Sequence, residues 1–170
     1  MKIVLVFITF LLPVFIAAQT PEERLVKLGL TLPAAPPPAA NYVNVVRTGN
    51  LLYLAGKGPT SADGKWITGK VGQDLTIEQG YDAAKSVALA QLAVLKNELG
   101  DLSKVKRIVK VNGFINSTPE FTDHPKVMNG YSDLMVAVFG DKGKHARSSV
   151  GVCSLPLNIA VEVEMVVEVE

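Results

Sequence analysis

Ile159–Glu170 reads IAVEVEMVVEVE and alternates between apolar and acidic side chains over most of its length. Successive side chains of a β-strand point to opposite faces of its sheet, so this alternation predicts a strand with one apolar face. The other face carries four glutamates, which are Glu162, Glu164, Glu168 and Glu170. We expect the apolar face to pack against other elements, and the acidic face to be solvated or to line a polar cleft.

A helix that could cover this apolar face is predicted to begin at Thr76. Thr76 and Gln79 fit a capping box, and Gly100 stands where a helix commonly stops. Between them apolar side chains recur every three or four residues, which predicts one buried helix face. These positions are Tyr81, Ala84, Ala88, Leu92, Leu95 and Leu99.

A second helix is predicted after Asp123, which can cap it, with His124 and Pro125 in its first turn. Its apolar side consists of Val127, Tyr131, Leu134, Met135 and Val138. Further strands are predicted at 42–47, 51–55, 105–114 and 147–155, with a doubtful one at 66–67. The order β-β-(β)-α-β-α-β-β predicts a sheet with its helices packed on one face.

The first 18 residues have the three-part pattern of a secretory signal peptide. Met1-Lys2 carries a positive charge, residues 3–16 are apolar except for Thr9, and Ala17-Ala18 offers small side chains for cleavage. The alternative is a membrane anchor, but an apolar run of about 14 residues is shorter than the roughly 20 that span a bilayer. We therefore expect an exported chain, periplasmic or secreted, without stable membrane insertion after cleavage.

Residues 19–40 are expected to form a short helix and a stiff connector ahead of a domain at 41–170. Pro21 suits the first turn of a helix, and Leu25, Leu28 and Leu30 could lie against the domain. Residues 33–40 are rich in proline and alanine, which favours an extended connector.

Composition narrows the classes of function. A net charge of +1 provides no strong field to attract nucleic acid or an anionic membrane. The single cysteine, Cys153, excludes an intrachain disulfide, and we interpret it as a buried structural thiol. With only two histidines, no cluster has metal-ligand spacing, so a metal site is not expected. Asn116-Ser117-Thr118 formally fits a glycosylation acceptor.

Several short motifs occur in an order and at a spacing that resemble the RidA (YjgF-type) family of imine and enamine deaminases. The match runs from about Pro38 to the C-terminus. Its motifs are Asn41-Tyr42-Val43, Gly49-Asn50-Leu51, Ala55-Gly56-Lys57-Gly58-Pro59, Asp101-Leu102-Ser103-Lys104-Val105, Ala146-Arg147-Ser148-Ser149-Val150, Leu155-Pro156 and Val161-Glu162-Val163-Glu164. Residues 116–139, with their Ser-Thr-Pro-Glu-Phe insertion, resemble a branch distinct from the best-studied deaminases.

This resemblance implies an α+β, chorismate-mutase-like fold in which two helices pack on one face of a mixed sheet. It also implies a homotrimer with ligand clefts between neighbouring subunits. RNA cleavage has been proposed for the wider family, but the basic residues near Lys104 lack an aromatic stacking platform, and we interpret them as a solvated strand edge.

The resemblance assigns catalytic roles to Arg147 and Glu162. The arginine matches a residue that binds the substrate carboxylate, for which a planar guanidinium is suited. Glu162 matches an acidic residue that positions or activates the attacking water. The alternatives are a surface arginine at a strand start and one member of a solvated glutamate face.

Four further positions match ligand-binding residues of the family: Tyr42, Gly56, Asn129 and Ser149. Each also has a purely structural interpretation, such as a core aromatic for Tyr42 or a turn glycine for Gly56. At three positions the chain departs from the family pattern. Ala55 replaces a serine, Ser149 a cysteine and His145 a frequent proline.

The function implied is cofactor-free hydrolysis of reactive 2-imino and 2-enamino acids to 2-keto acids and ammonia. The first alternative is a non-catalytic protein of the same fold that binds small carboxylates, because the site residues are altered and an exported chain lacks an obvious supply of short-lived imines. The second is a role in protein interaction, with the cleft as a remnant.

Overall fold

The computed structural model describes residues 19–170 except residues 36 and 39, so the signal peptide predicted for residues 1–18 lies outside the described residues. The helices are α1 (Pro21–Lys27), α2 (Ile77–Leu99) and α3 (His124–Phe139), and the short 3-10 turns are η1 (Leu102–Lys104), η2 (Gly140–Gly143) and η3 (Pro156–Asn158). The strands are β1 (Val45–Thr48), β2 (Leu51–Lys57), β3 (Val105–Asn116), β4 (Ala146–Val152) and β5 (Val161–Val169). Within the described part of the chain, no helix combines the length and apolar character that crossing a bilayer requires.

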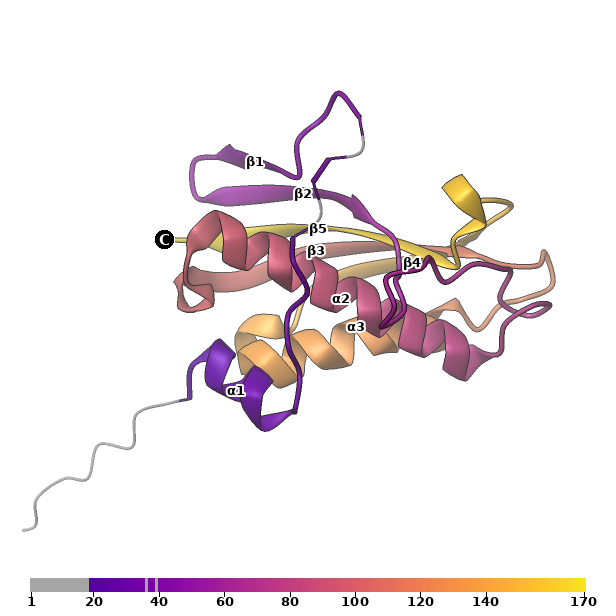
Figure 1. Cartoon of the computed structure of the whole chain (residues 1–170), viewed down its shortest axis with the longest axis horizontal. Coiled ribbons are helices and arrows are strands. Elements are labelled where there is room, and N and C mark those ends of the chain that lie inside the picture. Colours follow the sequence, from indigo (N-terminus) through magenta and orange to yellow (C-terminus); the bar gives the residue numbers. More distant parts are fainter. Residues whose placement is uncertain (1–18, 36, 39) are drawn as a thin grey trace, which may run out of the picture.

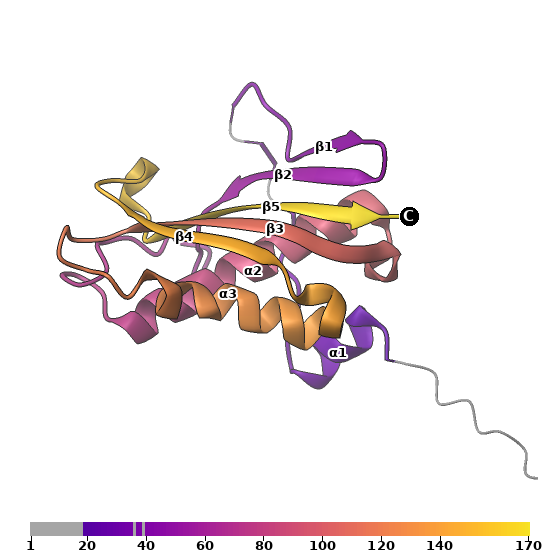
Figure 2. The same cartoon turned by 180° about the vertical axis from the view of Figure 1, so that it is seen from behind.

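The strands form one five-stranded mixed sheet in the order β1-β2-β5-β3-β4. β3 and β4 are parallel and joined through α3, whereas the other neighbours are antiparallel. Both long helices lie on the same side of the sheet (Figures 1 and 2). The predicted α+β class, with two helices on one face of a mixed sheet, is confirmed. The doubtful strand at 66–67 is reduced to an isolated bridge between Thr60 and Trp66.

β5 has the two faces that its sequence predicts. Val161, Val163 and Val167 are fully buried beneath the helices, while Glu162 and Glu164 alternate with them and are half-buried on the open face. Because β5 is hydrogen-bonded to β2 on one side and to β3 on the other, each of its side chains is assigned to a definite face.

The ends of α2 follow from its capping residues. Thr76 and Gln79 form the predicted capping box, and Gly100 closes the helix with a φ of 73°, which favours glycine. The prediction for α3 is only partly right. Its apolar side is buried as expected, but the Asp123 side chain makes no capping hydrogen bond. The Asp123 carboxylate instead pairs with Lys126 at 3.0 Å.

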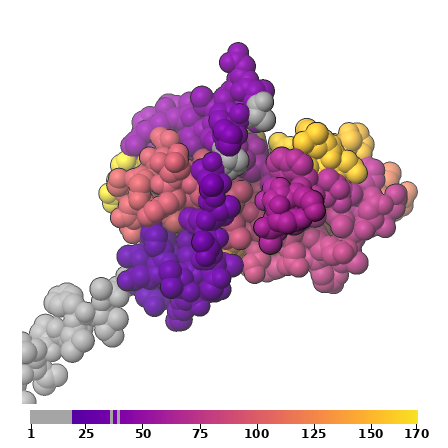
Figure 3. Space-filling model, viewed as in Figure 1, coloured from indigo at the N-terminus to yellow at the C-terminus, as the bar shows by residue number. Residues whose placement is uncertain are grey.

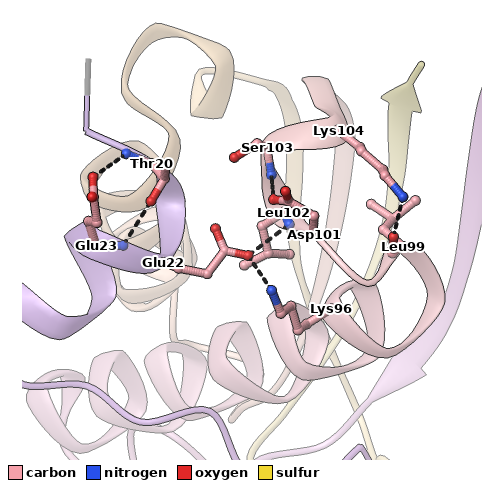
Figure 4. Close-up of polar contacts among 9 residues, drawn as sticks. All are labelled: Thr20, Glu22, Glu23, Lys96, Leu99, Asp101, Leu102, Ser103 and Lys104. Atoms are coloured by element: carbon pink, nitrogen blue, oxygen red, sulfur yellow. Dashed lines mark hydrogen bonds and ion pairs between the residues drawn. The ribbon is translucent and has the colours of Figure 1, made fainter. Parts of the chain in front are cut away.

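Helix α1 is attached to the domain by Glu22 and Leu25. One carboxylate oxygen of Glu22 accepts hydrogen bonds from Lys96 Nζ at 2.6 Å and from the backbone N–H of Leu102 at 2.9 Å (Figure 4). Leu25 is 4 % exposed and belongs to the core, and Leu30 packs against the core. The prediction for Leu28 is wrong: it follows the last helical turn and is 47 % exposed.

Beyond α1 the chain crosses the surface toward the β1–β2 hairpin (Figures 1 and 3). Leu32 and Ala35 in this connector are partly buried against the core, and the described residues of the stretch are neither helix nor strand. The connector therefore packs along the domain without forming a regular element in its described residues.

The close crossing of α2 and α3 predicts that alanine is tolerated at one helical glycine and destabilising at another. A Cβ at Gly130 would overlap the backbone carbonyl of Tyr81, which cannot rotate away. A Cβ at Gly80 would meet only methyl groups of Val127 and Val71, at 3.1–3.3 Å. We expect Gly130→Ala to lower the free energy of unfolding by about 2 kcal/mol or more, despite the better helix propensity of alanine.

Gly80→Ala is the matched control, and its free energy of unfolding should stay within about 1 kcal/mol of wild type. Urea unfolding followed by circular dichroism measures both variants. Equal stability of the two would show that the helices do not approach as closely as the structure indicates.

Candidate functional site

Arg147 lies on the edge strand β4, and its side chain is clamped by α3. Nη1 donates hydrogen bonds to Asn129 Oδ1 at 3.1 Å and to Ser132 Oγ at 2.9 Å, and Nη2 donates to the backbone carbonyl of Pro125 at 3.4 Å. Within the described residues, these three hydrogen bonds do not use Nε–H or the second Nη2–H. These two N–H groups share one edge of the guanidinium. That edge is suited to hold a carboxylate at two points.

A chain of hydrogen bonds through Ser132 and His145 supports the guanidinium from behind. His145 Nδ1 lies 2.7 Å from the carbonyl oxygen of Gly143, which can only accept, so Nδ1 carries the proton. The neutral ring then accepts at Nε2 from Ser132 Oγ, 3.0 Å away. Ser132 is thereby oriented to accept from Arg147. The sequence identified His145 only as a departure from the family pattern, and nothing in it pointed to Ser132.

Burial governs the titration of these groups. It lowers the pKa of His145, the hydrogen bond to Gly143 opposes that shift, and the charge of Arg147 adds to it. Burial also lowers the pKa of Arg147, and the nearby charge of Asp133 partly opposes this. A neutral imidazole beside a charged guanidinium is therefore the state that the surroundings favour.

Ser149 shares the sheet face of Arg147. The register pairs Arg147 with Val111 and Ser149 with Gly113, two positions along β3 that both face the helices. The Ser149 Oγ is buried and has no hydrogen-bond partner in the described structure. A buried hydroxyl normally finds a partner, so this unpaired Oγ, which is closed off from solvent on the same face as Arg147, is an exception.

Glu162 lies beside Gly56 on the open face of the sheet. A Cβ at Gly56 would overlap the Glu162 carboxylate, so the absence of a side chain there leaves room for the acid. Gly56 also falls where the β2–β5 register shifts, between Leu54 and Lys57. Burial raises the pKa of Glu162, and the like charge of Glu164 adds to this. A carboxylate with a raised pKa is a stronger base than an ordinary glutamate.

Tyr42 lies in the segment just before β1 and is 47 % exposed, so it is not a core aromatic. Two residues further on, the backbone carbonyl of Asn44 accepts from Ala55 N–H at 3.0 Å. The Asn44 side chain accepts from Lys57 Nζ at 2.5 Å. These bonds fasten the segment that carries Tyr42 alongside the stretch of β2 that contains Gly56.

The structure therefore divides the predicted site residues into two groups on opposite faces of the sheet. Val111 faces the helices and is the register partner of Arg147, whereas Phe114, of opposite parity on β3, is the register partner of Glu162. The arginine half-site comprises Arg147, Asn129 and Ser149. The glutamate half-site comprises Glu162 and Gly56, and the segment that carries Tyr42 runs alongside the stretch of β2 that contains Gly56. Within a single chain the two catalytic candidates point away from each other.

Two other expectations are corrected. Cys153 is exposed and not buried, because β4 ends at Val152 and the chain leaves the sheet before the thiol could turn inward. Asn116 is fully buried, and its amide donates to Asn158 Oδ1 and to the carbonyl of Ile159. The formal glycosylation acceptor is therefore inaccessible in the folded chain.

Within the described range, no group of three or more His, Cys, Asp and Glu side chains could hold a metal ion.

Comparisons with known proteins identify relatives whose similarity extends over nearly the whole described chain. The profile of the family described as "YjgF/chorismate_mutase-like, putative endoribonuclease" matches residues 22–169. Protein TCP17 of Trypanosoma cruzi is 45 % identical over 90 % of this chain and 96 % of its own. A 2-iminobutanoate/2-iminopropanoate deaminase of Dermatophagoides farinae is 31 % identical over 83 % of this chain and 95 % of its own.

Among solved structures, the protein Atu1372 from Agrobacterium tumefaciens, of unknown function, superposes with a TM-score of 0.82. It is 43 % identical, and the match covers 89 % of this chain and 94 % of that one. The similarity therefore extends to the arrangement of the helices and strands in space.

The buried His145 in the chain of hydrogen bonds behind Arg147 predicts a pH dependence of the free energy of unfolding. Because the pKa of folded His145 lies below its ordinary value of 6.5, the unfolded chain binds more protons just below that pH. The stabilisation is complete above pH 6.5 and is lost as the pH falls toward the lowered pKa of the folded state. We expect His145→Asn to show a smaller loss of unfolding free energy between pH 7.5 and pH 5 than wild type, measured by urea unfolding. Identical pH slopes would contradict a neutral, buried His145.

Proposed function

The chain belongs to the YjgF/RidA family, and on this premise we propose that it hydrolyses reactive 2-imino acids to 2-keto acids and ammonia. The observation that carries the proposal is the clamped guanidinium of Arg147, whose open edge lies on the same sheet face as the unpartnered hydroxyl of Ser149. The open edge of the guanidinium offers a carboxylate two parallel charge-assisted hydrogen bonds.

The proposed reaction uses this chain's own groups. Arg147 binds the substrate carboxylate, and Glu162 takes a proton from a water molecule as that water adds to the C2 of the imine. The proton then passes from Glu162 to the nitrogen of the tetrahedral adduct. Glu162 next takes the hydroxyl proton and delivers it to the same nitrogen, so that the C2–N bond breaks as the C2=O bond forms and a 2-keto acid and ammonia are released. Most of the acceleration would come from placement and from electrostatic stabilisation.

The raised pKa of Glu162 supports its role as the base. A general base works best when its pKa approaches the operating pH, because proton transfer then has both a deprotonated acceptor and a sufficient driving force. The largest cause of the raised pKa of Glu162 is burial, which an ordinary solvated glutamate on the strand surface would lack.

The two half-sites can act together only if a second copy completes the site, and we propose that the active form is a homo-oligomer. The β4 edge of one copy would meet the open sheet face of the next, bringing Arg147 opposite Glu162. Exposed apolar side chains on β1, β2 and β4 support an interface: Val46 is 53 % exposed, Tyr53 47 % and Val150 46 %. A closed ring of three such heterologous contacts is the homotrimer that the family resemblance implies.

The alternative is a carboxylate-binding protein without turnover. Ala55 supports it, since this side chain cannot supply the hydrogen bond of the serine that the family commonly has there. The loss of one such bond costs roughly 0.5–1.5 kcal/mol, which weakens binding without abolishing it. The export predicted from residues 1–18 also supports it, because it would separate the chain from enzymes that produce imines.

The first test is the release of keto acid and ammonia from freshly generated 2-iminobutyrate and 2-iminopropionate. We expect Glu162→Gln to lower the rate by 10²–10⁴-fold, as is typical when a general base is removed. Wild-type activity should fall as the pH drops through the raised pKa of Glu162, and the variant should lack this limb.

Arg147→Ala should lower kcat/KM by about 10²-fold, and Arg147→Lys should restore only part of this, because an ammonium lacks the two-point fork. Binding of 2-ketobutyrate by the folded wild-type protein, without acceleration of hydrolysis, would establish the carboxylate-binding alternative instead.

The shared site predicts complementation between inactive variants. If Arg147→Ala and Glu162→Gln chains are unfolded and refolded together in equal amounts, about a quarter of the sites draw both intact residues from different copies. Activity should therefore recover to about a quarter of wild type.

The control mixes Arg147→Ala with the double variant that carries both substitutions, which provides no intact Arg147. Recovery in neither mixture, although the chains co-assemble, would place the whole site within one chain.

A further inference from the structure

We propose that a cavity of about 450 Å³, separate from both half-sites, binds a small organic anion that carries an apolar group. The cavity lies where the far end of β4, the segment after β3 and the first turn of α3 come together. Lys70, Ser117, Phe121, His124, Val152 and Cys153 are among its lining residues. Its volume falls within the usual range for small-molecule sites.

The charge of the lining selects an anion. Lys70 supplies an ammonium and His124 an imidazole, and none of the lining residues is Asp or Glu. Lys70 Nζ donates to Asn116 Oδ1 at 3.0 Å and to the backbone carbonyl of Cys153. An ammonium has three N–H groups, so one remains for a ligand. Because buried Asn116 is itself bonded to Asn158 and Ile159, the cation is held in place before a ligand arrives.

Ser117 and His124 add polar groups to the same cavity. Ser117 Oγ lies 3.2 Å from His124 Nε2, and a Cβ at Gly151 would overlap both atoms. Glycine at this position of β4 therefore allows the hydroxyl and the ring to lie against the strand. His124 is also the first residue of α3, where the helix dipole is positive and favours an anion.

The rest of the lining is apolar and preformed. Phe121 meets the His124 ring edge to face, with ring centroids 5.3 Å apart, and Val152 lines the cavity with it. The loop that carries Phe121 is fixed by backbone hydrogen bonds from Thr118 N–H to Val71 and from Phe121 N–H to Thr118. An aromatic or branched aliphatic group beside the anionic head of a ligand would fill this part of the cavity.

Cys153 provides a direct test, since it is the only cysteine of the chain, is exposed and lines the cavity. Iodoacetate and iodoacetamide are similar in size and both alkylate a thiolate, forming a C–S bond and releasing iodide, but only iodoacetate is an anion. The measured quantity is the rate of alkylation by iodoacetate divided by the rate with iodoacetamide. We expect this ratio to be about tenfold higher for Cys153 than for the free thiol of N-acetylcysteine, as one charge-assisted hydrogen bond implies.

Lys70→Met should reduce this ratio to that of the free thiol. Lys126→Met is the matched control, because it removes the same charge from a residue that does not line the cavity and should leave the ratio unchanged. A Cys153 ratio equal to that of N-acetylcysteine in wild type would overturn the proposal.

A second measurement needs no substitution at the cavity. Phenylacetate should slow alkylation of Cys153 by iodoacetamide, whereas the neutral phenylacetamide should not. The same protection in Arg147→Ala would separate this cavity from the arginine half-site and from the proposed deaminase activity. Absence of protection by phenylacetate, or equal protection by both compounds, would contradict an anion site.

Discussion

The position of β5 between β2 and β3 is the constraint on which the rest of the structure depends. A strand bonded on both sides cannot rotate, so Val161, Val163, Val167 and Val169 must face the helices and the glutamates must face away. The helix-facing side chains form the centre of the core beneath α2 and α3. The same constraint places Glu162 on the open face and, through the register of β3, places Arg147 on the other.

Separation of the half-sites gives each a different environment. Arg147 is oriented by groups of α3, and a neutral His145 behind Ser132 allows the guanidinium to be held without another charge in contact with it. Glu162 is partly buried among strand residues, which makes it more basic. The proposed carboxylate clamp and the proposed base can therefore be tuned independently, and the proposed contact between copies would determine when they act together.

The segment after β3 gives the chain a second region of chemical interest. In one direction it leads into α3, which clamps Arg147, and in the other it closes the cavity beside Cys153. Both features lie along β4, because Arg147 is near the beginning of this strand and Gly151 is near its end. One edge strand would thus serve both proposed ligand sites, which share none of the residues assigned to them.

The sequence by itself determined the alternation of β5, the caps of α2 and the family motif around Arg147, because each depends on residues a few positions apart. Only the tertiary structure decided that Arg147 and Glu162 lie on opposite faces, that Ser132 and His145 support the guanidinium, and that Cys153 is exposed. These features depend on the register between strands and on where a strand ends, which are set by packing among segments far apart in the chain.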